Sequence, residues 1–321
     1  MLFITNRVLN EGPESSKGRS ISFKLSDNNA LQSVFFCERT KEGQYIELLS
    51  KPFFGKLRSS PYKQILLFIH GFNNLPEESA FQRAEMLQAL LDKLSISVEV
   101  VPVIWPCEDH SVKNVLENYL SDQLAADASG TAFARAFAKF EDFQAAHLEE
   151  EDPCNKRISI LAHSMGNRVL RESLRIWCDE IRRNGPPMLF RNAFLAAADI
   201  INESLNSDGD ARFIHNASRN TVVYFASDDL ALRASKVVNA RDVSRRLGHT
   251  GPFDMTKVPA SVYAIDCDNV NTLYDPPTGH TYFLNIPGGQ ALKPGKVFKH
   301  IAKCLETGRV EADALNQLII E

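Results

Sequence analysis

Residues 157–170 read RISILAHSMGNRVL, and this stretch decides the fold. Its first part, 158–162, is a short apolar run of β-branched and aliphatic residues, which predicts a buried strand. The tetrapeptide His163-Ser164-Met165-Gly166 ends the run. Apolar residues then return near helical spacing, which predicts a helix; they are Val169, Leu170, Leu174, Ile176 and Trp177. A strand, a sharp turn with a serine at its tip and a helix follow the order of a nucleophile elbow.

The turn of such an elbow leaves little room, so small residues belong two positions before and two positions after the serine. Here these residues are Ala162 and Gly166, whereas the usual pattern has glycine at both positions. Ala162 departs from the pattern by a single methyl group. Because five residues also fit an ordinary strand-to-helix turn of an α/β protein, the rest of the chain must decide between the two interpretations.

The chemistry of the elbow depends on its serine. A serine hydroxyl is a poor nucleophile at neutral pH and must lose its proton to a nearby base during attack. A strained turn exposes the oxygen and places it at the amino end of the next helix, where backbone N–H groups can bind a developing oxyanion. The pattern therefore predicts that Ser164 is the nucleophile.

Composition excludes several classes of protein. The chain has 321 residues, of which 44% are hydrophobic, enough for one large α/β domain or two small ones. Its net charge is −4, and the basic pairs Arg182-Arg183 and Arg245-Arg246 are isolated, so no nucleic-acid partner is expected. No apolar run approaches the ~20 residues that span a membrane. Residues 1–18 lack the basic start of a signal peptide, so we expect a cytoplasmic protein.

The six cysteines lie far apart, and none belongs to a C-x-x-C pair. In a chain without an export signal we expect free, mostly buried thiols. The sequence predicts no metal site and no cofactor.

The first part of the chain reads as rich in strands. Short apolar segments at 1–6, 20–25, 34–37 and 45–49 are separated by polar stretches with Gly, Pro, Ser and Asn. Neighbouring short strands of this kind predict an antiparallel β extension over residues 1–60.

From residue 64 onward, strands and helices alternate. Apolar runs predict strands at 64–69, 98–104, 189–198, 220–226 and 261–265, in addition to the one before Ser164. Helical patterns are found at 76–94, 230–238 and 293–306, and 112–147 divides into two helices near residues 128–130. This alternation predicts one α/β domain over 1–321, with a mostly parallel sheet and helices on both faces.

Ligands of such sheets bind at the carboxyl ends of the strands. The reactive residues fall there: Gly71, Ser164, Asp199, Asp228, Asp229 and the loop after Asp266.

A serine nucleophile needs a histidine base, which follows the serine and the acid when the serine stands on an elbow of this type. His280 lies in a glycine-bearing loop after the last predicted strand, where a base can reach over the sheet edge, and is favoured. His249 precedes that strand and stays an alternative. His215 comes too soon after Asp199 to follow the acid, and His300 lies inside a predicted helix as a surface or dipole-capping residue.

The acid that orients the base has three candidates. Asp229 directly follows a predicted strand and ranks first, although it also suits a helix N-cap. Asp228 is the next choice, and Asp199, after the preceding strand, is the third.

The oxyanion hole is expected to combine the N–H of Met165 with that of Phe72, in the loop after the strand at 64–69. Gly71 lets the backbone approach the substrate closely. His70 and His163 are interpreted as structural, hydrogen-bonded residues that flank the site.

Taken in order, the segments LLFIHGFN, VIWPC, ISILAHSMGNRVL, VYFASDDLAL and GHTYF resemble the α/β-hydrolase superfamily. With the opening MLFITNR, they are most similar to its bacterial branch of α/β hydrolases of unknown function. The resemblance covers most of the chain and implies an eight-stranded, mostly parallel sheet. By motif position it also implies Ser164 as nucleophile, Asp229 as acid and His280 as base.

The sequence thus predicts a metal-independent serine hydrolase that acts on a small acyl substrate, an ester, thioester or amide. Two alternatives use the same fold: an inactive binding or scaffold protein, and an acyltransferase with the same three residues. Segments 107–151 and 241–258 lie over strand ends as candidate lids. Their phenylalanines could line an acyl pocket, although helical spacing of the first three also fits core packing; they are Phe133, Phe137, Phe140, Phe143 and Phe253.

Overall fold

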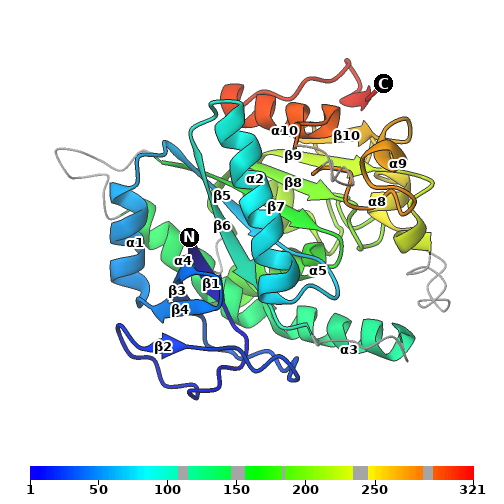
Figure 1. Ribbon diagram of the computed structural model, residues 1–321. Coiled ribbons are helices and arrows are strands. Elements are labelled where there is room, and N and C mark those ends of the chain that lie inside the picture. Colours follow the sequence, from blue (N-terminus) through cyan, green and yellow to red (C-terminus); the bar gives the residue numbers. More distant parts are fainter. Residues whose placement is uncertain (108–114, 146–155, 183–184, 234–244, 285–291) are drawn as a thin grey trace.

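The computed structural model describes residues 1–107, 115–145, 156–182, 185–233, 245–284 and 292–321. The strands of this part of the chain form a single sheet (Figure 1). In spatial order they are β11 (Gln317–Ile319), β10 (Val262–Asp266), β9 (Ser218–Phe225), β8 (Phe190–Ala196), β7 (Arg157–His163), β5 (Gln64–Ile69), β6 (Val98–Ile104), β1 (Leu2–Thr5), β3 (Phe35–Lys41), β4 (Gln44–Glu47) and β2 (Ser20–Ile21).

The sheet is parallel from β11 to β1 and antiparallel from β1 to β2. This confirms the predicted mostly parallel sheet with an amino-terminal antiparallel extension. The described sheet has eleven strands, eight of them parallel, so it is larger than the eight-stranded sheet that the resemblance implied; β3, β4 and β2 are the antiparallel strands. β1 pairs in parallel with β6, so the first strand belongs to the main sheet. A helix that the sequence analysis did not foresee, α1 (Ser50–Ser59), also lies within residues 1–60.

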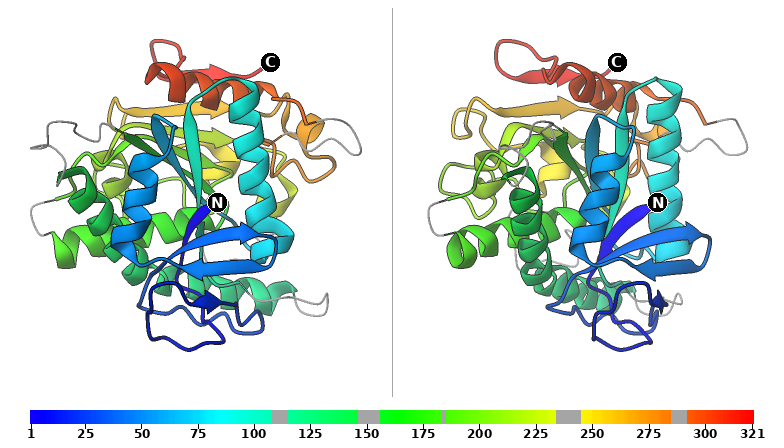
Figure 2. Two further views of the ribbon diagram at one scale, coloured as in Figure 1. Left: turned by 60° about the vertical axis from the view of Figure 1, so that its left-hand side comes forward. Right: turned by 90° about the vertical axis from the view of Figure 1, so that its left-hand side faces the viewer.

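Helices cover both faces of the sheet (Figures 1 and 2). On one face lie the π-helical turn η1 (Pro76–Phe81), α2 (Gln82–Lys93) and α10 (Lys296–Thr307). On the other face lie α1, α3 (Val115–Ala128), α4 (Gly130–Ala145), α5 (Gly166–Ile176) and the π-helical turn η2 (Trp177–Ile181). Shorter helices follow the later strands: α6 (Arg212–Asn216), α8 (Leu247–Thr250) and α9 (Asn271–Tyr274).

The central strand β5 shows why its sequence is almost wholly apolar. Ile65, Leu67 and Ile69 point into the core beneath α5, whereas Leu66 and Phe68 point into the core beneath α2. All six residues of the strand are buried, because a strand with helices on both faces has no solvent side.

The break between α3 and α4 lies at Ser129, within the predicted interval. A Cβ atom at Gly130 would come within 2.8 Å of the Cβ of Glu172, so the glycine lets α4 pack closely on α5. The phenylalanines of α4 point into the core, where Phe133, Phe137 and Phe140 are at most 1% exposed. These three act as core residues, whereas Phe143 lines a surface pocket next to Phe54 and Phe253 is 61% exposed.

Among the described helices, none has the length and apolarity needed to cross a bilayer. The cysteines that the structure describes are free and buried; they are Cys37, Cys107, Cys178, Cys267 and Cys304.

Candidate active site

Ser164 stands on the turn between β7 and α5, with a left-handed backbone conformation of φ 52°. A non-glycine residue in this region is strained, and such strain is found at functional turns. The backbone of Ser164 is held at both ends: its N–H donates to the carbonyl of Ala196 at 3.0 Å, and its carbonyl accepts from the N–H of Asp199 at 3.2 Å. The end of β8 thus fixes the strained turn.

Gly166 is required by the close approach of β5. A Cβ atom there would lie 2.5 Å from the carbonyl oxygen of His70 and 2.8 Å from that of Ile69. Ala162 lies within β7, between Ile69 and Leu195, and the sheet accommodates its methyl group in a fully buried position. The departure from the usual glycine at this position is therefore compatible with the turn.

Asp229 and His280 meet at the carboxyl end of the sheet. The Nδ1 atom of His280 lies 2.7 Å from Oδ2 of Asp229, although 51 residues separate the two. Asp229 is fully buried after β9, and its Oδ1 accepts from the N–H of Leu232 at 3.0 Å. Since the carboxylate accepts, Nδ1 carries the proton, and Nε2 is left on the far edge of the ring to exchange a proton with another group.

The loop that carries His280 is fixed by side chains that the sequence analysis did not single out. Asp275 Oδ2 accepts from the N–H of His280 at 2.8 Å and from that of Thr281 at 2.7 Å. Gly279 has φ 63°, and a Cβ atom there would lie 2.5 Å from the amide nitrogen of Asn271. A carboxylate five residues before the histidine, in a loop with Pro and Gly, was the available sequence signal.

His163 joins this loop to the elbow. Its Nε2 donates to the carbonyl of His280 at 3.2 Å, and the two rings lie 4.7 Å apart between centroids. Because His163 directly precedes Ser164, the base loop is one residue away from the candidate nucleophile. Burial holds the pKa of His163 well below its usual value, so the ring stays neutral and acts as a donor.

The loop after β5 packs against the elbow. A Cβ atom at Gly71 would lie 3.0 Å from the Cβ of Ser164, so only glycine fits without a shift. The Gly71 carbonyl accepts from Nδ1 of His70 at 3.0 Å and from Nδ2 of Asn74 at 3.1 Å. In a trans peptide the carbonyl and the next N–H point in opposite directions, so the N–H of Phe72 is turned away from these donors.

His70 is neutral and structural, as the sequence analysis interpreted it. The N–H of Trp105 donates to its Nε2 at 3.2 Å, and the two rings stack. Burial lowers the pKa of His70 to about 3. This histidine therefore holds the loop and exchanges no proton at neutral pH.

The amino end of α5 supplies the second group of donors. Its first backbone bonds run from the N–H of Asn167 to the carbonyl of Ser164 at 3.1 Å and from that of Arg168 to Met165 at 2.9 Å. The N–H groups of Met165 and Gly166 come before these bonds and have no acceptor within the helix. The helix dipole also favours negative charge at this end.

The carboxylates of the two alternative acids bind residues other than His280. Asp228 accepts from the amide of Asn271, and Asp199 accepts from the hydroxyl of Tyr119 while lying 3.4 Å from Nε of Arg246. Of the three candidates, the structure brings Asp229 to His280.

Two of the other histidines, His215 and His300, lie apart from this pair. His215 is on α6, just before the amino end of β9, and so at the opposite end of the strands from Ser164. His300 is buried, contrary to the predicted surface position, because its Nδ1 lies 2.7 Å from the hydroxyl of Tyr224 and its Nε2 donates to Glu311. His249 is on α8.

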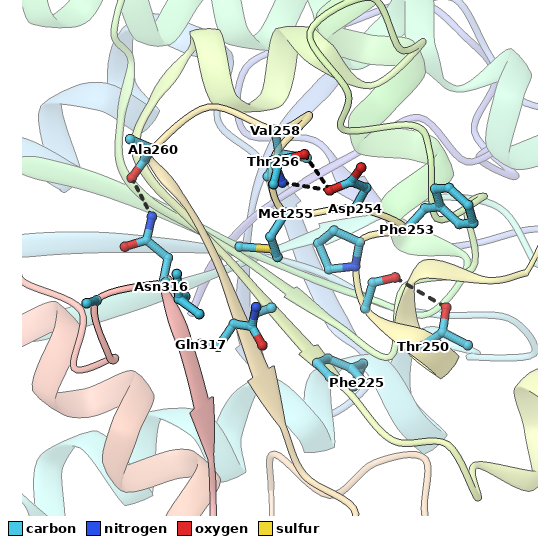
Figure 3. Close-up of a pocket in the computed structure, with 15 residues that line it drawn as sticks. Phe225, Thr250, Phe253, Asp254, Met255, Thr256, Val258, Ala260, Asn316 and Gln317 are labelled. Atoms are coloured by element: carbon cyan, nitrogen blue, oxygen red, sulfur yellow. Dashed lines mark hydrogen bonds between the residues drawn. The ribbon is translucent and has the colours of Figure 1, made fainter.

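A cavity of about 700 Å³ lies elsewhere, along β9, β10 and β11 (Figure 3). Its lining includes Phe225, Phe253 and Asn316, but none of Ser164, Asp229 and His280. In the described part of the chain, no three His, Cys, Asp or Glu side chains gather as metal ligands would.

Comparison with known proteins gives one family match. The model of a family described as alpha/beta hydrolase of unknown function (DUF900) matches residues 49–288. No curated protein matches the chain. Among solved structures, phospholipase PlaB from Legionella pneumophila matches with 12% identity and a TM-score of 0.30, over 73% of this chain. The chain spans 44% of the length of that protein.

Proposed function

The chain belongs to the family of alpha/beta hydrolases of unknown function, and from this membership we propose that it is a metal-independent serine hydrolase. Its substrate is an ester, thioester or amide, which it cleaves through an acyl-enzyme. The observation that supports this most is the Asp229–His280 hydrogen bond, formed by a loop that His163 ties to the strained turn of Ser164.

In the first half of the reaction, His280 Nε2 takes the proton of Ser164 Oγ while this oxygen attacks the substrate carbonyl carbon. Asp229 keeps the ring oriented and stabilises the imidazolium. The oxyanion of the tetrahedral intermediate accepts from the N–H groups of Met165 and Phe72, and each such donor is worth about 3 kcal/mol of transition-state stabilisation. The intermediate collapses, the leaving group departs with the proton from His280, and Ser164 remains acylated.

In the second half, His280 takes a proton from water, whose oxygen attacks the acyl carbon. A second oxyanion forms and collapses, the carboxylic acid leaves, and His280 returns the proton to Ser164. Each proton that the ring accepts is thus released in the next step, so the cycle needs no external acid or base.

The test is covalent labelling with a fluorophosphonate probe, followed by mass mapping of the modified residue. We expect labelling at Ser164, its loss in Ser164→Ala, and parallel loss of turnover of a short-chain aryl ester. Ser207→Ala, at an exposed serine, is the control and should label like the parent protein. A folded parent protein that takes up no probe at Ser164 would contradict the proposal and favour the inactive binding protein.

Hydrolysis and acyl transfer share these steps until the second nucleophile arrives. Product analysis with an added alcohol separates them: free acid as the main product supports hydrolysis, and the ester of the added alcohol supports acyl transfer.

A further inference from the structure

Arg83, in the first turn of α2, is an arginine whose position the fold alone does not explain. Its side chain is half-buried, and its Nη1 donates to Oδ1 of Asn74. Within the part of the chain that the structure describes, no carboxylate oxygen lies within 4 Å of its guanidinium.

Three other arginines of the described chain that are largely shielded from solvent pair with carboxylates. Arg39 lies 2.7 Å from Glu77, Arg168 lies 2.6 Å from Asp127, and Arg171 lies 2.9 Å from Glu172. A shielded charge without a counter-ion is costly, and native proteins normally avoid it. Burial lowers the pKa of Arg83, and Asp275 is the charged group that opposes this shift. The guanidinium therefore lacks a close anion.

One side of Arg83 is tied to the oxyanion loop. Asn74, which accepts from Arg83, donates through Nδ2 to the carbonyl of Gly71 at 3.1 Å and to that of Phe72 at 2.6 Å. Because a guanidinium only donates, it forces Asn74 to present its oxygen to Arg83 and its NH₂ group to the loop. Arg83 is thus two hydrogen bonds from the loop that packs on Ser164.

The charge of Arg83 also acts on the base loop. This charge attracts Asp275, the residue whose carboxylate binds the N–H groups of His280 and Thr281. The same charge also contributes to lowering the pKa of His163. A positive group thus lies near both loops that frame Ser164, and it remains partly open to solvent.

We propose that Arg83 anchors an anion-binding subsite beside Ser164, and that the substrate is an ester bearing a carboxylate or phosphate group. This inference rests on the proposed function. Asn74 uses one of the five N–H groups of the guanidinium, and the planar fork suits two-point binding of either anion. A bound anion would supply the counter-charge that Arg83 lacks, so recognition of the acidic substrate also relieves the cost of the shielded cation.

The kinetic test compares two aryl esters that differ only in charge: the monoaryl ester of glutaric acid and its methyl-capped neutral form. We expect the parent protein to prefer the acidic ester in kcat/KM by about 10-fold or more. In Arg83→Met the loss on the acidic ester should exceed the loss on the neutral one by about 30-fold, mainly through KM. A third ester with phosphate in place of the carboxylate tells which anion the subsite prefers.

Two variants serve as references. Arg83→Lys keeps the charge without the fork and should retain part of the preference. Arg157→Met removes an exposed arginine at the opposite end of β7 from Ser164, and should leave the preference unchanged. Equal losses on the acidic and neutral esters in Arg83→Met would show that Arg83 only holds Asn74, and would overturn the inference. A parent protein with equal kcat/KM for the acidic and the neutral ester would also overturn the inference.

Binding without turnover separates this inference from the proposed function. Titration of Ser164→Ala with glutarate, and separately with inorganic phosphate, should give a heat of binding that disappears in Ser164→Ala/Arg83→Met. If Ser164 fails to label but glutarate or phosphate still binds through Arg83, the subsite stands and the hydrolase proposal falls. If neither anion binds a folded Ser164→Ala, the subsite is overturned even where Ser164 labels.

Discussion

At the residue scale, the aspartates near the candidate site differ in their hydrogen-bond partners, and this difference decides which of them can orient the base. Asp228 and Asp229 are consecutive, yet one accepts from Asn271 and the other from His280. The difference arises from the direction of the chain as it leaves β9. Asp229 is turned into the interior, where its carboxylate has a fixed geometry, whereas Asp228 stays half-exposed.

Replacement of Asp229 by Asn tests its assignment as the acid. The amide keeps the shape of the carboxylate but removes its charge and favours the wrong tautomer of His280. We expect kcat for an aryl ester to fall about 10³-fold or more in Asp229→Asn, with a small change in KM. Steady-state kinetics of the purified variant measures this effect, and its unfolding midpoint shows that it is folded.

Asp228→Asn and Asp199→Asn are the matched controls for this variant. Each removes a carboxylate that follows a strand of the same sheet without touching His280, and neither should lower kcat by more than about 10-fold. A large loss in either control, with Asp229→Asn still active, would transfer the role of acid to that residue.

The sequence could rank these residues but could not separate them. Both aspartates follow the same strand, and which one turns inward depends on the last backbone angles of β9, which residue types do not encode. His163 illustrates the same limit. Its role lies in a hydrogen bond to the backbone carbonyl of His280, 117 residues further along the chain, and no local sequence pattern predicts such a bond.

At the element scale, the turn between β7 and α5 stores strain that a stability measurement can detect. Ser164 has φ 52°, a conformation that costs a residue with a Cβ atom about 1–2 kcal/mol and glycine nothing. We expect Ser164→Gly to be more stable than Ser164→Ala by about 1 kcal/mol, because relief of strain exceeds the added freedom of the unfolded chain. Urea unfolding of both inactive variants measures the difference.

Ser173, inside α5, is the matched control because its backbone is helical. There the order should reverse, with Ser173→Gly less stable than Ser173→Ala by about 1 kcal/mol. If glycine were the less stable variant at both positions, the turn would hold no strain at Ser164.

Elements with strong periodicity were predictable, and short ones were not. The strands at 64–69 and 98–104 have the predicted bounds, because buried parallel strands are continuous apolar runs. α1 was missed since Pro52 and Gly55 weaken its helical pattern, and it is the packing of Phe53 and Leu57 in the core that stabilises it. β11 has three residues, too few for alternation to show.

At the scale of the whole molecule, histidines in the interior link stability to pH. The pKa values of His70, His163, His215 and His300 are all lowered, chiefly by burial, so the folded protein keeps these rings neutral. In the unfolded chain the same rings take up protons near pH 6.5. The unfolded state therefore binds more protons below that pH, and the free energy of unfolding must fall as the solution becomes acidic.

The size of this acid effect follows from the two most deeply buried rings. At pH 5 each of His70 and His163 contributes a loss of about 2 kcal/mol relative to pH 7.5, or about 4 kcal/mol together.

Urea unfolding at pH 7.5, 6.0 and 5.0 measures this loss, which should begin near pH 6.5. Hydrogen-bonded carboxylates such as Glu77 weaken the fold only as the pH falls below about 4.5, so they add nothing to this loss. Burial raises the pKa of Glu99 and Asp266, which opposes the loss, and lowers the pKa of the Met1 amino group, which adds to it. His300→Gln keeps a donor for the Glu311 carbonyl and removes one titrating ring, so its pH profile should be flatter than that of the parent. An unfolding free energy that stays level or rises from pH 7.5 to 5.0 would contradict this prediction.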